Sequence, residues 1–457
     1  MFTHLSRVFS VRPVVAAAAF AAALTGQTVH GADQAGQAQP AMDMYSAVKA
    51  AIAWHPSVRT AQGQLLQADE GVAVAKAGYY PQVQAGIGSQ MRNRVMESYG
   101  SRRVHDASVS VSQMLYDFGK VDSAVLQAEA SITTAQAQVQ LSTEEVARET
   151  ALAWVEVHRQ QDLSEIAKAQ VKGVSALADL TKERQIKGAS ARSDSVQAQS
   201  RVEAARSQAI NYAAQAQRWQ VRLMYLTGLK TQPVISDDAP TQLPQACSAG
   251  LGAQALPTAA VLRAQGQRTQ AQADLKAADA QLKPTLSVDG SLARGLTSSS
   301  RPAAYGAVDA QVMLNFKAPL FEGGRNEARQ RAAIHALDAA DAAVAYAQFQ
   351  AQQTLHDAQA QTVGMQQRAP VLDERIDSIR TTRDLYREQY LQLGTRSLLD
   401  LLNAEQEYHN ARFDKVETAH EMQRLAVECW YQSGRLREVF DIQQPVLADA
   451  NRRGVGK

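Results

Sequence analysis

The sequence predicts a mostly α-helical chain with a membrane β-barrel portion, built as a tandem repeat of helix, strand, strand, long helix and long helix. Three observations lead to this prediction. A strand-to-helix corner occurs twice, and the segments before each corner alternate between apolar and polar residues. The segments after each corner are long, rich in Ala and Gln, and nearly free of Gly and Pro.

The two corners are the main evidence for the duplication. Each one ends an alternating run and opens a helical run. The residues concerned are Tyr116, Asp117, Phe118 and Gly119 in the first copy and Phe321, Gly323 and Gly324 in the second. When the corners are aligned, Pro81 comes close to Pro284, and the turn glycine Gly188 comes close to Gly394. Several features that recur in one order predict two halves of the same architecture.

The N-terminus resembles a secretory signal peptide over residues 1–31. Arg7 and Arg12 precede the apolar run 14–24, which is followed by small residues. A transmembrane anchor is the alternative, but the apolar run is too short to span a bilayer as a helix.

The remaining boundaries follow from the repeat. We expect a first repeat over 41–230, with a β-hairpin at about 82–116 and a long helical hairpin at about 121–228. A linker over 231–257 separates it from a second repeat over 258–440, with a β-hairpin at about 284–318 and a helical hairpin at about 326–436. A flexible tail over 441–457 completes the chain.

The four alternating runs are predicted to be membrane-crossing strands. Each has about 10 residues, enough to cross a bilayer core when tilted. One face is apolar and the other carries Gln, Ser, Asp and Asn, as expected for lipid outside and water inside. A soluble hairpin would show the same alternation. Because four strands cannot close a barrel and open edges in lipid are costly, two or three copies must combine.

The long runs are predicted to be helices that pack along their whole length. The run from Val121 to about Ile186 contains no proline and a single glycine, Gly173. Apolar residues recur in it every seven positions, namely Val125, Ile132, Val139, Val146 and Ala153. This spacing is typical of a coiled-coil seam. Gly188 and Gly394 are expected to form the turns at the helix tips.

Charge, cysteines and motifs exclude several functions. Removal of Arg7 and Arg12 with the signal peptide lowers Lys+Arg from 47 to 45, which equals Asp+Glu at 45, so no nucleic-acid partner is implied. Cys247 and Cys429 are compatible with one disulfide or with two unpaired thiols.

Asp117-Phe118-Gly119 matches a kinase tripeptide, but the sequence lacks the other kinase motifs. No catalytic arrangement, metal-ligand spacing or cofactor motif is readable, so we expect neither an enzyme nor a cofactor.

The corners, the Pro-ended helices and the segment from Gly394 to Ala404 resemble the TolC-like outer membrane factor family over essentially the whole mature chain. The resemblance implies a homotrimer with a twelve-strand β-barrel in the outer membrane, joined to a twelve-helix α-barrel in the periplasm. It also implies an exit duct that works with a periplasmic adaptor protein and an inner membrane transporter.

The resemblance also implies a periplasmic gate at the helix tips. Asp194 matches an acid of one hairpin that ties to an arginine of the other hairpin, which Arg396 matches. Asp400 matches an aspartate that rings the constriction, whereas Asn403 stands where the family has a second aspartate. Tyr390 lies one position before the expected tyrosine. The alternatives are that Asp194 and Asp400 cap helices and that Arg396 is merely solvated.

Type I protein secretion with an inner membrane ABC transporter is the expected use, because the absence of a lipid-anchored cysteine and the corner from Tyr116 to Lys120 resemble the secretion branch of the family. The alternatives are the outer membrane component of a multidrug efflux pump, driven by a proton-driven pump, and a periplasmic coiled-coil adaptor. The expected location is the outer membrane, in contact with its lipid, with a long periplasmic extension.

Overall fold

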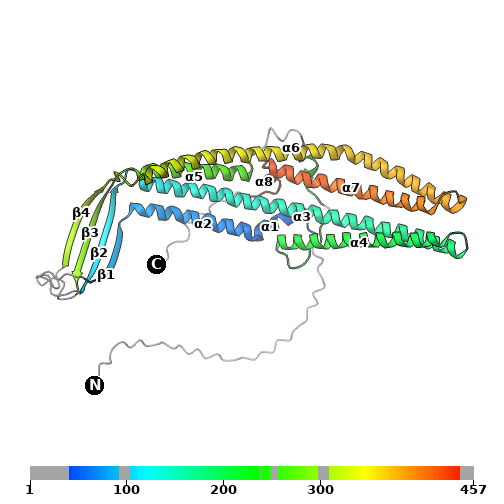
Figure 1. The fold of residues 1–457 in the computed structure, drawn as a ribbon, viewed down its shortest axis with the longest axis horizontal. Coiled ribbons are helices and arrows are strands. Elements are labelled where there is room, and N and C mark those ends of the chain that lie inside the picture. The colour runs from blue at the N-terminus through cyan, green and yellow to red at the C-terminus, as the bar shows by residue number, and fades with distance from the viewer. Residues whose placement is uncertain (1–40, 92–102, 237, 249–255, 297–307, 443–457) are drawn as a thin grey trace, which may run out of the picture. The chain divides into compact units, whose positions relative to one another are not determined.

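The computed structural model describes residues 41–91, 103–236, 238–248, 256–296 and 308–442. The predicted signal peptide, most of the predicted tail and both strand-to-strand loops lie outside these ranges. The two halves follow the same order of elements (Figure 1). The first half consists of α1 (Met44–Trp54), α2 (Pro56–Lys76), η1 (Ala77–Tyr79), β1 (Gln82–Met91), β2 (Arg103–Tyr116), α3 (Lys120–Ile186) and α4 (Arg192–Thr227).

The second half repeats a helix, two strands and two long helices. It consists of η2 (Leu243–Gln245), α5 (Ala259–Gln281), β3 (Thr285–Gly295), β4 (Val308–Lys317), α6 (Arg325–Glu388), the π-helical segment η4 (Gln389–Leu393), α7 (Leu398–Gln432) and α8 (Leu436–Val439). The fold is therefore mostly helical with one small antiparallel sheet, as the sequence predicts. No helix in the described ranges is both long and apolar enough to cross a bilayer.

The four strands form one antiparallel sheet in the order β1-β2-β3-β4. It lies beyond the N-terminal ends of α3 and α6 (Figure 1). Directly paired residues share a face, so the register sorts the side chains into two sets. Val83 pairs with Val111 in a row that ends at Val312, whereas Gln82 pairs with Ser112 in a row that reaches Asp289. One face of the sheet is therefore apolar and the other polar.

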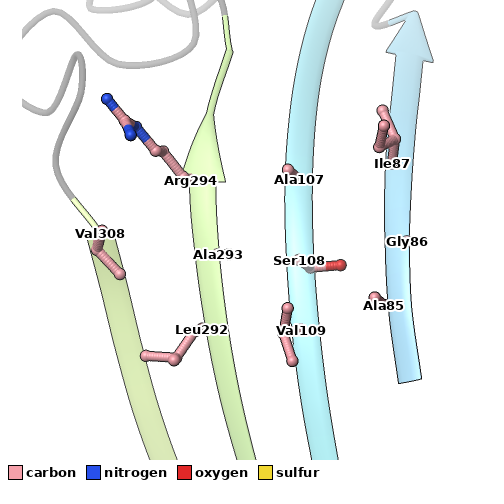
Figure 2. A pocket seen from close by; sticks show the side chains of 10 residues that line it. All are labelled: Ala85, Gly86, Ile87, Ala107, Ser108, Val109, Leu292, Ala293, Arg294 and Val308. Carbon is pink, nitrogen blue, oxygen red and sulfur yellow. The ribbon is translucent and has the colours of Figure 1, made fainter. Parts of the chain in front are cut away.

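The apolar face of the sheet is uncovered in the single chain. Val83, Ile87 and Val312 are 66%, 80% and 81% exposed. Apolar and small side chains, including Ala85, Val109 and Leu292, also line a hollow on the sheet (Figure 2). β1 and β4 are the edge strands, and among the described strands neither pairs with a further strand.

Helix α3 is the central helix of the chain and packs against α2, α4, α5 and α7. The heptad positions predicted as its seam face inward: Val125, Val139, Val146 and Ala153 are buried, and Ile132 is half-buried. Ala and Val at these positions let neighbouring helices approach closely while they remove apolar surface from water. The seam prediction is therefore confirmed.

The largest apolar core lies where the halves meet at mid-length of α3. Trp154 of α3, Leu223 of α4, Trp430 of α7 and Phe440 are all nearly inaccessible. The segment between the repeats belongs to this core, because Leu243 is buried in it and Met42 forms a parallel bridge with Ile235.

A buried ion pair links α8 to α3 beside this apolar core. Arg437 of α8 lies 3.0 Å from the carboxylate of Glu144 on α3, which is fully buried. Burial raises the pKa of Glu144, and the hydrogen bond from Gln140 and the charge of Arg437 oppose that shift. Removing Arg437 would leave a buried carboxyl without its cation, which is costly.

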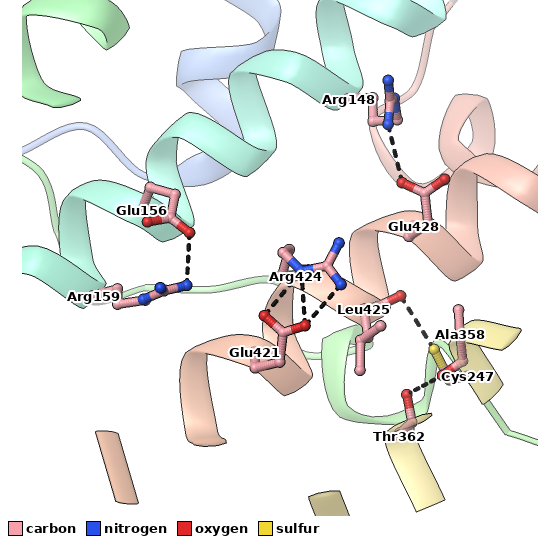
Figure 3. A network of polar contacts seen from close by, with 10 residues as sticks. All are labelled: Arg148, Glu156, Arg159, Cys247, Ala358, Thr362, Glu421, Arg424, Leu425 and Glu428. Carbon is pink, nitrogen blue, oxygen red and sulfur yellow. Dashed lines mark hydrogen bonds and ion pairs between the residues drawn. The ribbon is translucent and has the colours of Figure 1, made fainter. Parts of the chain in front are cut away.

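A disulfide joins Cys247, between the repeats, to Cys429 of α7. The alternative of two free thiols is thereby excluded. One residue before Cys429, Glu428 accepts from Arg148 of α3 at 3.1 Å (Figure 3). Two neighbouring residues of α7 therefore connect this helix to the segment between the repeats and to α3.

Reduction of this disulfide is predicted to lower the free energy of unfolding by about 2–4 kcal/mol, because the unfolded chain regains the freedom of the loop that the bond closes. Thermal unfolding with and without reductant measures the effect. In the double variant Cys247→Ala/Cys429→Ala, reductant should leave the melting temperature unchanged. Equal melting of oxidised and reduced wild-type protein would contradict the prediction.

Candidate gate at the helical tips

Two glycine turns reverse the chain at the tips of the helical hairpins. Gly188, between α3 and α4, has φ +73°, and Gly394, between η4 and α7, has φ +62°. A side chain is strained in this left-handed conformation, which explains glycine at both positions. The turns place Asp194 at the start of α4 and Asp400 at the start of α7.

The two aspartates occupy equivalent positions. Each is the third residue of its helix, and neither is the N-cap, which is Ala191 in α4 and Ser397 in α7. Asp194 accepts from the hydroxyl of Ser190 at 2.8 Å, and the N–H of Asp400 donates to the Ser397 hydroxyl at 3.1 Å. The N-cap alternative is therefore wrong for both. A carboxylate in the first turn is still favoured by the helix dipole.

Arg396 is held within its own hairpin. Its Nε donates to the Gln389 side chain at 3.1 Å, and its guanidinium lies 4.4 Å from the centre of the Tyr386 ring. It also lies 3.9 Å from the Asp400 carboxylate. Within the described part of one chain, no contact joins Arg396 to Asp194. The structure thus brings together Arg396 and Asp400, but not the predicted pair.

Tyr390 lies in the apolar cluster that joins the two hairpins near their tips. It is 6% exposed, whereas the adjacent Leu391 is 39% exposed. The cluster comprises Val174, Leu177, Ala198, Val202, Tyr390, Leu398, Leu401 and Leu402. The guanidinium of Arg184 lies 4.8 Å from the Tyr390 ring centre, which adds a cation–π contact. Tyr390, not residue 391, is therefore the side chain placed between the hairpins.

A direct polar contact crosses from one hairpin to the other. Arg201 of α4 donates to the Asn403 side-chain oxygen of α7 at 3.5 Å. Arg201 was not among the residues expected from the sequence. Its position two helical turns after Asp194, on the same helix as the predicted acid, is a signal that could have suggested it.

A buried polar cluster behind the tips was also missed. Glu405 and His409 of α7 contact each other at 3.1 Å, and Arg383 of α6 lies 3.6 Å from the same carboxylate. The cluster packs against α3 at Gly173, where a Cβ would collide with the Glu405 carboxylate. The lone glycine of α3 therefore makes room for a charged side chain of the other hairpin.

The strand-to-helix corners connect this helical part to the sheet. The Asp117 carboxylate accepts from the N–H groups of Gly119 at 2.9 Å and Val121 at 2.6 Å, and so satisfies the first turn of α3. The rings of Tyr116 and Phe118 meet edge to face with centres 4.6 Å apart.

The second corner is more open. Phe321 is 84% exposed, and Gly323 and Gly324 both have positive φ. Across the described ranges, no three His, Cys, Asp or Glu side chains gather in a way that could hold a metal ion.

Comparison with known proteins identifies the family of this chain. The model of the outer membrane efflux protein family matches residues 47–229 and 255–427, one range in each half. The outer membrane efflux protein BepC of Brucella suis is 22% identical over 359 residues, which cover 78% of this chain and 77% of BepC.

Solved structures share the fold. The outer membrane protein VceC of Vibrio cholerae has a TM-score of 0.72 at 19% identity, with 86% of this chain and 96% of VceC covered. The CmeC outer membrane channel of Campylobacter jejuni has a TM-score of 0.73 at 14% identity, with 86% of this chain and 85% of CmeC covered.

The variant Gly173→Leu is predicted to lower stability by about 1–3 kcal/mol, because the added side chain displaces the buried Glu405 carboxylate from His409 and Arg383. Gly364→Leu is the matched control, since nothing lies within 4 Å of a Cβ at that helical glycine. Thermal unfolding of both variants tests the prediction. Equal melting temperatures would show that Gly173 is not a packing requirement.

Proposed function

The chain belongs to the outer membrane efflux protein family, and from this premise we propose that three copies form a passive exit duct from the periplasm through the outer membrane. One observation carries the proposal. The four-stranded sheet has an uncovered apolar face, a polar face and two open edges. In lipid, open edges leave backbone groups without hydrogen bonds, so further copies must pair with β1 and β4. Three copies would supply twelve strands.

The helical part supports the same assembly. Exposed apolar side chains lie on α6, including Tyr346 at 64% and Phe349 at 61%. Others lie on α2 and α4, including Leu66 at 59% and Ile210 at 71%. We infer that α6 of one copy packs against α2 and α4 of the next, which would bury both sets and close twelve helices into a tube.

We propose that the helix tips form the gate of this duct. The Tyr390 cluster and the Arg201–Asn403 contact hold the hairpins together in one chain. Arg396 and Asp194 would add a latch when the tips of the tube converge, with Asp400 facing the constriction. Exposed pairs of this kind contribute less than about 1 kcal/mol each, so the gate requires several. A periplasmic adaptor that separates the hairpins would open it.

We propose type I protein secretion with an inner membrane ABC transporter as one use of the duct. The second candidate is drug efflux with a proton-driven pump, and the similarity to the outer membrane efflux protein BepC favours an efflux role in general. Deletion of the gene separates them. Loss of a secreted protein from the medium supports the first use, and increased drug sensitivity supports the second.

Insertion of the purified protein into planar bilayers is predicted to give a small basal conductance. Asp194→Ala and Arg396→Ser should each raise the open-to-closed ratio by up to about fivefold, because each removes one exposed pair of the latch. Arg380→Ser is the control, because it removes an exposed ion pair with Asp377 on the same hairpin, away from the tip. An absence of conductance would overturn the duct, and unchanged gating in both tip variants would overturn the latch.

A further inference from the structure

A basic cavity lies at the base of the sheet, where the strands give way to α3 and α6. Its volume is about 630 Å³. The sheet side is lined by Gln82, Ser112, Thr285, Ser287 and Lys317, which come from all four strands. Because paired residues share a face, these side chains belong to the polar face of the sheet. The cavity is complete within one chain.

Four cationic side chains and one carboxylate line this cavity, which leaves a net charge of +3. The cations are Lys120, Lys317, Arg325 and Arg329, and the carboxylate is Glu322. Arg325 donates to Glu322 at 2.7 Å and holds the pKa of Glu322 below its usual value. Lys120 donates to the Thr285 hydroxyl at 2.8 Å. One cation is therefore neutralised and a second is bound to a neutral group.

The other two cations lack a close carboxylate. Within the described part of the chain, neither Lys317 nor Arg329 has an ion-pair partner within 4 Å. The nearest acid on the polar face, Asp289, accepts from Ser112 and Asn315 at 2.5 Å each. Its hydrogen bonds are therefore directed to neutral groups, and its attraction to Lys317, like that of Glu322 to Arg329, acts over more than 4 Å.

Two of these cations lie at helix N-termini, where a positive charge lowers the stability of the fold. Lys120 is the first residue of α3 and Arg325 is the first residue of α6. The N-terminal end of a helix carries partial positive charge, so a cation there is repelled and an anion is attracted. The start of α3 is already compensated by the Asp117 carboxylate, and Arg325 is neutralised by Glu322. An anionic group in the cavity would compensate the remaining cationic side chains, Lys120, Lys317 and Arg329.

We propose that this cavity is a transient binding site for carboxylate or phosphate groups of cargo, and that it makes the duct favour anionic cargo. The inference rests on the proposed function, because only in the duct does the polar face line the passage. Three copies would place three such cavities at one level of the passage. Their combined field would concentrate anions there.

Ion selectivity of the inserted protein tests the proposal. In a KCl gradient, the double variant Lys317→Gln/Arg329→Gln should shift the reversal potential toward cation selectivity relative to wild type. Arg331→Gln is the matched control, because this exposed arginine lies on α6 but does not line the cavity. Hexaglutamate should block the wild-type channel, and about tenfold more peptide should be needed to block the double variant.

A binding measurement separates this inference from the proposed function. Because the cavity is complete in one chain, fluorescently labelled hexaglutamate should bind the detergent-purified protein whether or not it forms channels. Affinity should fall about tenfold in the double variant and stay unchanged in Arg331→Gln. If channels conduct but neither selectivity nor binding responds to the double variant, the anion site is wrong and the duct stands. If the variants alter binding but no channel forms, the duct is wrong and the anion site stands.

Discussion

The unpaired edges of a four-stranded sheet are the constraint on which the rest of this structure depends. β1 and β4 each present a row of backbone groups without a partner among the described strands. Water can satisfy such groups, but hydrocarbon cannot, and the apolar face is suited to hydrocarbon. The strand-to-helix corners connect this sheet to the long helices. At the first corner, Asp117 ties the end of β2 to the start of α3.

The elements with a regular period were predictable from the sequence. Strand alternation and the seven-residue seam of α3 depend on local geometry alone, and the structure places their apolar residues as expected. Gly188 and Gly394 were predictable because a left-handed turn requires glycine. The Cys247–Cys429 disulfide was not predictable from the sequence, because it depends on whether the two segments meet in space. The segment before Cys247 was likewise predicted to be a linker, but its Leu243 is buried in the largest apolar core.

The candidate gate was only partly predictable. The resemblance pointed to the helical tips and to a pair of Arg396 with Asp194, whereas within one chain Arg396 contacts Gln389, Tyr386 and, at 3.9 Å, Asp400 of its own hairpin. The π-helical segment before Gly394 changes which side chains face inward, so Tyr390 occupies the buried position. Gly173 was visible as an isolated glycine, but its role depends on Glu405, which lies far along the chain. Contacts between distant helices carry no local sequence signal, which is why Arg201, Glu405 and His409 were missed.

We infer that one chain cannot complete its own sheet in lipid. Native mass spectrometry of the particle extracted from outer membranes in mild detergent tests this inference. We expect a particle with three times the mass of the processed chain, with no single-chain species at equilibrium. A particle with the mass of one chain, extracted from the membrane in folded form, would contradict it.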